Sequence, residues 1–292
     1  MHISVITPVY HGNKYLNKYM KMMEKAAEPF AARGNSVEVI LVNDSPDVDI
    51  VYDGNLVKSF RVSVINNNEN IGIHGSRVNG LNNCSGDYIV FLDQDDIISH
   101  HCFTTHAKAI KDGDISLGNG ILEAGIERND IFGGKFSQKF ASRPWVYIWI
   151  RDFIVSPGQC LIKKSAIPEY WKEHILSANG TDDYLLWLLM FNNGSVMNCN
   201  YHKVYLHCDT GENVSSDSGK MFESTKELLA ALETCPDYNK SVSALIKRRI
   251  YYKEADRGNK KEFVLKSIKN MDVFLVNVFY RIVWRGCLVS KK

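Results

Sequence analysis

Short apolar segments in the first part of the chain each run directly into polar residues. The apolar segments are 3–7, 37–42, 62–65 and 88–92, and the polar groups at their ends are 7–10, 43–45, 66–68 and 93–96. Helical patterns separate the segments, and strands that alternate with helices imply a mostly parallel sheet with helices on its faces. Ligands of such sheets bind beyond the carboxyl ends of the strands. We therefore expect an α/β fold whose polar strand ends meet at one edge.

The pattern of the remaining segments completes this outline. Pro8 is expected to end the first strand, and glycine-rich turns in the middle region (Gly118, Gly120, Gly125, Gly133-Gly134) suggest strands and loops. Helices are expected over 15–32, after Gly75, and over 145–153, 182–191, 221–233 and 242–255, with a further strand over 195–207. Thr181 or Asp182 is a suitable N-cap for the helix that begins at 182.

Composition excludes several classes of protein. The 292 residues suffice for one large domain, alone or with an appendage, and a net charge of +2 argues against a dedicated nucleic-acid binder. The seven cysteines are scattered singly, which indicates free thiols in a reducing compartment and neither a zinc ribbon nor a disulfide framework. The N-terminus does not resemble a signal peptide, and no apolar stretch is long enough to span a bilayer. A cytoplasmic protein is expected.

Three carboxylates follow the strand over 88–92 within four residues: Asp93, Asp95 and Asp96. Burying carboxylates is costly unless a cation meets them. A divalent metal shared with a phosphate ligand would do so, because hard cations choose oxygen ligands. Capping of the next helix explains one such acid, and we assign that role to Asp96.

Other strand ends offer weaker signals. Asp44 could accept a hydrogen bond from a nucleobase or ribose, or it could form an Asx-turn into Ser45-Pro46. The segment Asn70 to Arg77 is rich in glycine, which permits close approach to an anion, and Arg77 offers a fork to a phosphate. The segment is not a P-loop, because no Gly-Lys-Ser/Thr follows.

Two further places carry candidate chemistry. Asp182 and Asp183 open an apolar helix, where they either serve as a general base in a cleft or simply favour the helix dipole. His207 ends a strand and could complete a metal shell, although most single histidines are not ligands.

The far C-terminus has a distinct pattern. In 274–289, Asn277, Arg281 and Arg285 recur every fourth position and form one polar stripe on a helix that is otherwise apolar. Such a helix suits a membrane interface, or packs on the protein's own core or on another subunit.

Taken together, these residues resemble the GT-A fold, family 2 glycosyltransferases, over about residues 2 to 215. The motifs that carry the likeness are Val5-Ile6-Thr7-Pro8-Val9-Tyr10, Val42-Asn43-Asp44-Ser45, Asn70-Ile71-Gly72 and Gly86-Asp87-Tyr88-Ile89-Val90-Phe91-Leu92-Asp93-Gln94-Asp95-Asp96. The resemblance implies a Rossmann-like mixed sheet flanked by helices, a nucleotide-sugar donor and inverting transfer.

The resemblance also implies roles for individual residues. The residues expected to bind the nucleotide sugar are Thr7, Pro8, Val9, Tyr10, Asp44, Asn70, Gly72, Arg77, Asp93 and Gln94. By the same likeness, Asp95 and His207, with Asp93, would hold Mn²⁺ or Mg²⁺ on the diphosphate. Asp183 would be the catalytic base, with Asp182 as second choice because it stands where the family has Glu. Gln94 could face either the donor sugar or solvent.

These expectations define a hypothesis for the whole chain. Residues 1–215 would form the transferase domain, with a nucleotide-sugar-binding half (1–97) and an acceptor-binding half (98–215), and 216–292 a helical region. The enzyme would move a hexosyl or N-acetylhexosaminyl group from a UDP-sugar to a glycan or lipid-linked glycan in surface polysaccharide synthesis. It would work at the inner face of the cell membrane with peripheral contact through 274–289. The sequence leaves the oligomeric state open, and a homo-oligomer is one possibility. The alternatives are a nucleotidyltransferase, for which residues 10–15 supply only a thin phosphate loop, and a non-catalytic sugar-nucleotide or glycan-binding module.

Overall fold

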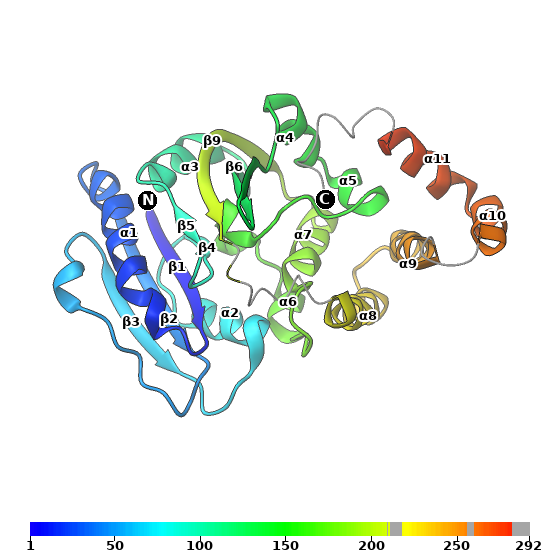
Figure 1. The fold of residues 1–292 in the computed structure, drawn as a ribbon. Helices are drawn as coiled ribbons and strands as arrows, with labels where there is room; N and C mark the ends of the chain where they lie inside the picture. Colours follow the sequence, from blue (N-terminus) through cyan, green and yellow to red (C-terminus); the bar gives the residue numbers. More distant parts are fainter. Residues whose placement is uncertain (209, 211–217, 256–259, 282–292) are drawn as a thin grey trace.

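A single mixed sheet forms the centre of the protein (Figure 1). The structure, a computed structural model, describes residues 1–208, 210, 218–255 and 260–281. Within them the sheet has nine strands in the order β3-β2-β1-β4-β8-β6-β9-β5, and β7 pairs with β6. The strands are β1 (His2–Val9), β2 (Ser36–Asn43), β3 (Arg61–Asn66), β4 (Tyr88–Phe91), β5 (Ile97–Ile98), β6 (Ile115–Ala124), β7 (Glu127–Asp130), β8 (Cys160–Lys163) and β9 (Met197–His207).

Helices flank this sheet and extend beyond it. They are α1 (Asn13–Ala31), α2 (Gly72–Asn82), α3 (Cys102–Ile110), α4 (Lys135–Ala141), α5 (Pro144–Trp149), α6 (Glu169–Glu173), α7 (Asp182–Asn192), α8 (Ser218–Thr234), α9 (Lys240–Ala255), α10 (Lys260–Lys269) and α11 (Met271–Phe279). Short 3₁₀ turns are η1 (Gly54–Leu56), η2 (Pro157–Gln159) and η3 (Lys164–Ala166). The helices from α8 onward lead away from the sheet on the side of α6 and α7 (Figure 1).

The parallel part of the sheet confirms the alternation expected from the sequence. Strands β3, β2, β1 and β4 are all parallel, and Val9 pairs with Asn43, which pairs with Asn66. The carboxyl ends of these strands therefore lie at one edge, and the four polar groups meet there as expected.

The first strand does not end at Pro8 as we predicted. The carbonyl of Ile6 accepts a hydrogen bond from the Leu92 N–H. The backbone N–H and C=O groups of the even-numbered residues of β1 therefore point toward β4. Pairing with β4 stops at Ile6, and Pro8 still pairs in register with Val42 of β2. Proline has no N–H to donate, but at Pro8 the neighbouring strand β4 has already ended. No hydrogen bond between strands is lost there, so β1 continues past Pro8.

Other boundaries also differ from the expectation. The helix expected after Gly75 begins at Gly72, which has a φ of +76° that glycine adopts without strain. The helix expected over 145–153 ends at Trp149, and the Asp152 carboxylate then accepts the Ile154 N–H at 2.8 Å. This local bond offers the backbone an alternative to another helical turn.

The middle region pairs into the same sheet. Strand β8 is antiparallel to β4 and β6, while β9 is parallel to β6. Gly118 and Gly120 are not in turns but within β6, at an irregularity in its pairing with β9. A Cβ on Gly118 would fall 2.4 Å from Val204 Cγ2, so only glycine lets the two strands approach this closely.

The helix α7 is buried on almost every side. Its residues Leu185 to Met190 are all less than 4% exposed. Thr181 stands at the N-cap position as expected, but its Oγ1 donates to the Ser224 carbonyl of α8 at 2.8 Å and makes no capping hydrogen bond to α7. Among the described residues, no helix has the length and apolar character needed to cross a bilayer.

Candidate active site

Asp44 organises the loop that follows β3. Its Oδ1 accepts from Asn67 Nδ2 at 2.8 Å and from the Ile71 N–H at 2.9 Å, and its Oδ2 accepts from the Gly72 N–H at 3.0 Å. Asp44 is 4% exposed, so these bonds satisfy a buried carboxylate and hold the start of α2 against β2. The alternative of an Asx-turn made by Asp44 is wrong, because both oxygens of Asp44 accept from the loop after β3, and Pro46, two residues on, has no N–H to donate.

The end of β1 presents only half of its residues to the edge. Thr7 is fully buried and its hydroxyl lies 2.6 Å from Tyr19 Oη, while Val9 is 1% exposed. Strand alternation puts Pro8 and Tyr10 on the other face, and Tyr10 is 52% exposed. The side chains of Thr7 and Val9 therefore belong to the core, and the expectation that the segment lies along a nucleoside stays a prediction.

The side chain of Gln94 bonds to the backbone of Tyr10. Its Oε1 accepts the Tyr10 N–H at 3.1 Å and its Nε2 donates to the Tyr10 carbonyl at 3.2 Å. A Cβ on Gly12 would fall 1.9 Å from Gln94 Oε1, so glycine leaves room for this contact. The amide ties the acidic strand end to the loop after β1, and its assignment as a sugar-binding group stays a prediction.

Asp96 is not the helix cap that we expected. It is 3% exposed and accepts hydrogen bonds from Tyr205 Oη, from the Cys208 N–H at 3.2 Å and, at 3.1 Å, pairs with His207 Nδ1. Asp96 thus fastens the end of β9 to the acidic strand end. The bond to Nδ1 fixes the orientation of the His207 ring, and Nε2 is the ring nitrogen that Asp96 does not contact.

Of the three acids at the end of β4, Asp93 pairs with Arg77 and Asp96 with His207, whereas the Asp95 carboxylate accepts from the neutral hydroxyl of Thr210. Burial, with the nearby charges of Asp96 and Asp93, raises its pKa to about 6. Thr210 donates to its Oδ2 at 3.1 Å. A crowded carboxylate of this kind fits a divalent cation, which would relieve the repulsion.

The three residues expected to hold a metal do not form a ready ligand set. Among the described residues, no three His, Cys, Asp or Glu side chains gather closely enough to bind a metal ion by themselves. Asp93 instead pairs with Arg77 at 2.8 Å. The assignment of Asp95 and His207 as metal ligands stays a prediction, and Mg²⁺ commonly takes one or two carboxylates and completes its shell with water and phosphate oxygens.

Arg77 does not offer a free fork to a phosphate, which corrects its expected role. It is 4% exposed, with Nη2 2.8 Å from Asp93 Oδ1 and Nη1 2.7 Å from Asp182 Oδ2. Both ends of the guanidinium are therefore taken by carboxylates from distant parts of the chain. Arg77 bridges the acidic strand end to the start of α7.

The ion pair with Arg77 gives the two acids at the start of α7, Asp182 and Asp183, opposite pKa shifts. Burial disfavours the charge of Asp182, but the Arg77 guanidinium outweighs it and holds the pKa of Asp182 below its usual range. For Asp183, burial together with the charges of Asp152 and Asp182 outweighs the effect of Arg77 and raises its pKa well above the usual range. The Tyr184 N–H donates to Asp183 Oδ1 at 2.7 Å. Asp182 is thus committed to an ion pair, whereas Asp183 is a half-buried carboxylate able to take a proton.

Sequence reasoning missed Asp152, whose charge acts on Asp183. Burial raises the pKa of Asp152 to about 7, against the opposing charges of Arg151 and Arg249. In the sequence, Asp152 is only a single acid near the end of the aromatic segment 145–153. No pattern in the sequence predicts that its charge acts on a residue of α7.

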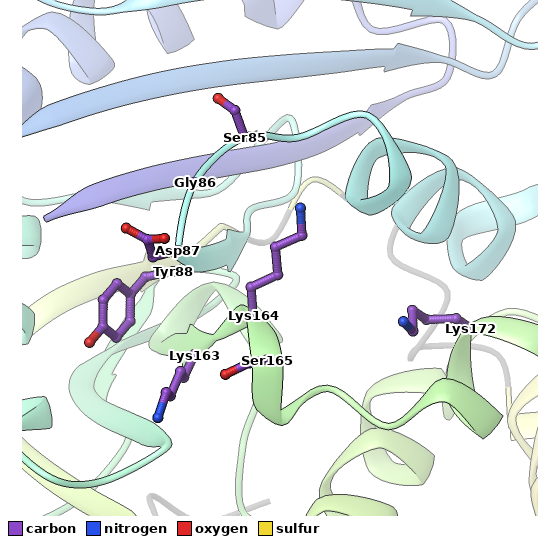
Figure 2. A pocket seen from close by; sticks show the side chains of 8 residues that line it. All are labelled: Ser85, Gly86, Asp87, Tyr88, Lys163, Lys164, Ser165 and Lys172. Carbon is purple, nitrogen blue, oxygen red and sulfur yellow. The ribbon is translucent and has the colours of Figure 1, made fainter.

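A separate hollow lies at the opposite, amino-terminal edge of β4 (Figure 2). It has a volume of about 540 Å³ and is lined by Ser85, Gly86, Asp87, Tyr88, Lys163, Lys164, Ser165 and Lys172. Lys164 Nζ donates to the Cys84 carbonyl at 2.7 Å, and Lys172 pairs with Glu169. The hollow is distinct from the acidic edge and shares none of its residues.

The mixed sheet, with its acidic strand end beside a buried acid-bearing helix, defines a GT-A fold. The crystal structure of S. aureus TarS 1–349 matches with a TM-score of 0.59 at 18% identity, covering 96% of this chain and 82% of that one. The family model for glycosyl transferase family 2 matches residues 4–171. More than half of the chain is covered, and the chain belongs to glycosyl transferase family 2.

Curated relatives match over shorter segments. Glycosyltransferase GlyA of Streptococcus pneumoniae is 34% identical over 125 residues, which cover 40% of this chain and 16% of GlyA. The GalNAc(5)-diNAcBac-PP-undecaprenol beta-1,3-glucosyltransferase of Campylobacter jejuni is 26% identical over 145 residues, which cover 47% of this chain and 44% of that enzyme. The chain therefore spans less than half the length of each of these relatives.

Proposed function

We propose that the protein is an inverting glycosyltransferase that moves a sugar from a UDP-sugar to a hydroxyl group of a glycan or lipid-linked glycan. The observation that carries the proposal is the Arg77 bridge, which joins Asp93 at 2.8 Å to Asp182 at 2.7 Å. It brings the acidic strand end, suited to a diphosphate and its cation, next to the carboxylate of Asp183. A donor and a base on opposite sides of one reacting carbon are what inversion requires.

In this proposal, Asp183 takes the proton of the acceptor hydroxyl as that oxygen forms a bond to the anomeric carbon. The bond from this carbon to the diphosphate oxygen breaks at the same time, and its electron pair leaves with UDP. Asp183 Oδ1 is held by the Tyr184 N–H, which leaves Oδ2 for the acceptor. A Mn²⁺ or Mg²⁺ ion held by Asp95 and His207 would supply Lewis-acid stabilisation of the diphosphate charge.

The comparisons support the choice of donor and acceptor class. A TarS fragment was solved with UDP-GlcNAc, at a TM-score of 0.59 and 16% identity, covering 94% of this chain and 79% of that one. The C. jejuni relative acts on an undecaprenol-linked glycan by its name. A hexosyl or N-acetylhexosaminyl transfer in surface polysaccharide assembly is the proposal that agrees with both.

The test of the proposal is UDP release from a panel of UDP-sugars in the presence of Mn²⁺ or Mg²⁺ and a glycan or lipid-linked acceptor. Transfer should depend on the acceptor, and the product linkage, read by NMR, should have the opposite anomeric configuration to the donor. Retention of configuration would exclude the inverting mechanism. Release of pyrophosphate from a sugar phosphate and a nucleoside triphosphate would instead indicate a nucleotidyltransferase.

Asp95→Ala should weaken metal-dependent UDP binding. We expect a loss of about 10- to 100-fold, the size commonly found when one group of a metal site is removed. Isothermal titration of UDP with and without Mn²⁺ measures it. Asp87→Ala is the matched control, since Asp87 is an exposed acid that lies in the hollow at the opposite edge (Figure 2). Equal affinity for all three proteins would show that Asp95 is not a metal ligand.

We also propose that the C-terminal helices contact a membrane surface. On α10 and α11 the apolar side chains of Leu265, Ile268, Leu275 and Phe279 are each 55–62% exposed. Lys266 and Lys269 lie in the last turn of α10 and would favour anionic lipid. The expected helix over 274–289 is described only to the end of α11, and residues 282–289 lie outside the described residues.

Deletion of residues 273–292 should move the protein from the membrane fraction to the soluble fraction while UDP affinity is unchanged. The physical reason is that the deletion removes exposed apolar area but no residue of the acidic edge. Cell fractionation with immunodetection and UDP titration measure the two effects. Unchanged fractionation would exclude membrane contact through this segment.

A further inference from the structure

Arg249 of α9 is a buried cation at the junction of three helices. It is 2% exposed, and its Nη2 donates to Tyr184 Oη at 2.5 Å. Within the part of the chain that the structure describes, its Nε and Nη1 have no hydrogen-bond partner. Burying a guanidinium without a bonded carboxylate is unfavourable, and an apolar side chain would pack there without that penalty. The charge therefore calls for a role beyond packing.

The contacts of Arg249 lead to the proposed base. Tyr184 Oη, which accepts from Arg249, donates in turn to the Tyr147 carbonyl of α5 at 2.6 Å. The backbone N–H of the same tyrosine donates to Asp183 Oδ1 at 2.7 Å. A displacement of Tyr184 would thus move the first turn of α7 and the carboxylate bonded to it.

Arg249 also acts on Asp183 through charge. Its guanidinium and that of Arg151 lower the pKa of Asp152, which burial raises. The charge of Asp152 in turn raises the pKa of Asp183, after burial and together with Asp182. The other ionisable groups around this pair are the side chains of Tyr147, Cys160, Tyr184 and Arg77. A base with a raised pKa accepts a proton more readily, which suits general-base catalysis near neutral pH.

We propose that Arg249 is a positioning residue that the C-terminal helical region supplies to the active site, where it holds Tyr184 against α5 and so fixes the first turn of α7. Its charge also favours the ionised form of Asp152. The proposal rests on the proposed function of Asp183 as base. It links the active site to one residue of α9, a helix that lies outside the segment that the family model matches. Arg249 itself touches neither donor nor acceptor in this proposal.

The test compares Arg249→Met and Arg249→Lys with the wild-type protein. We expect Arg249→Met to lower kcat by about 10- to 100-fold, the loss that a small misplacement of a reacting group causes, with the dissociation constant of UDP unchanged. Arg249→Lys should recover part of the loss, because it restores the charge. Arg248→Met is the matched control: Arg248 is exposed on the same helix and pairs with Asp272, so its kcat should stay at the wild-type value.

A second readout does not depend on transfer. In protein labelled with ¹³C-aspartate, Asp152→Asn identifies the Asp152 carboxyl signal, and Arg249→Met should move its titration to higher pH. Asp152→Asn should also move the loss of kcat at acidic pH to a lower pH, because it removes a charge that raises the pKa of Asp183. This variant tests the proposal even if Arg249→Met does not fold.

The outcomes separate this inference from the proposed function. A wild-type protein that turns over no UDP-sugar contradicts the proposed function, and the Asp152 titration still reports on Arg249. Unchanged kcat and an unchanged Asp152 titration in folded Arg249→Met would overturn the inference, as would an unchanged acid limb in Asp152→Asn. Equal losses of kcat in Arg249→Met and Arg248→Met would also overturn it.

Discussion

Asp183→Asn should abolish sugar transfer while UDP binding stays at the wild-type affinity. The amide keeps the shape of the side chain but cannot take the proton of the acceptor hydroxyl. Since a positioned general base contributes about 10²- to 10⁴-fold to a rate, we expect a loss of that size in kcat. UDP release with acceptor present measures kcat, and isothermal titration measures the affinity.

Asp47→Asn is the control for this experiment, because Asp47 is an exposed acid in the loop after β2. Its transfer rate should equal that of the wild-type protein. Normal transfer by Asp183→Asn would show that another group is the base, and a loss of UDP affinity in this variant would place Asp183 at the donor instead.

Asp182→Ala should destabilise the fold, in contrast to its neighbour. Asp182 and Arg77 are buried, with side chains 4% and 5% exposed, and they lie 2.7 Å apart. Removing one partner of a buried ion pair leaves the other charge uncompensated, which costs about 3–5 kcal/mol. Urea denaturation should show a fall of this size in the free energy of unfolding.

Lys226→Met is the matched control for stability. Lys226 pairs with Glu223 on the surface, with side chains 46% and 64% exposed, and such pairs contribute about 0–1 kcal/mol. Equal stability of Asp182→Ala and the wild-type protein would contradict the assignment of Asp182 as a structural partner of Arg77.

The two adjacent acids show how far a sequence motif determines roles. Both residues open the same apolar helix, and the sequence leaves open which of them is the base. Successive residues of a helix point in different directions, so each acid meets a different environment. Asp182 pairs with Arg77, and Asp183 is influenced by the charge of Asp152, and no spacing along the chain foretells either interaction.

The same contrast applies to the acidic strand end. An apolar strand followed by Asp93, Asp95 and Asp96 predicts a cluster of acids at the sheet edge, and the parallel pairing of β1 to β4 places it there. The hydrogen-bond partner of each acid could not be predicted from the sequence. Asp96 binds Tyr205 and His207, which come from the far end of β9.

The sequence by itself determined the layout of this protein: the buried parallel strands, the edge where their polar ends meet, and the family to which the chain belongs. Those features follow from local periodicity and short motifs, which are written into neighbouring residues. Only the tertiary structure decided which charges are paired. Arg77 reaches Asp182 across 105 positions and Arg249 reaches Tyr184 across 65, and contacts of that separation depend on how the helices pack. Burial then sets the proton affinity of each acid, and burial exists only once the chain has folded.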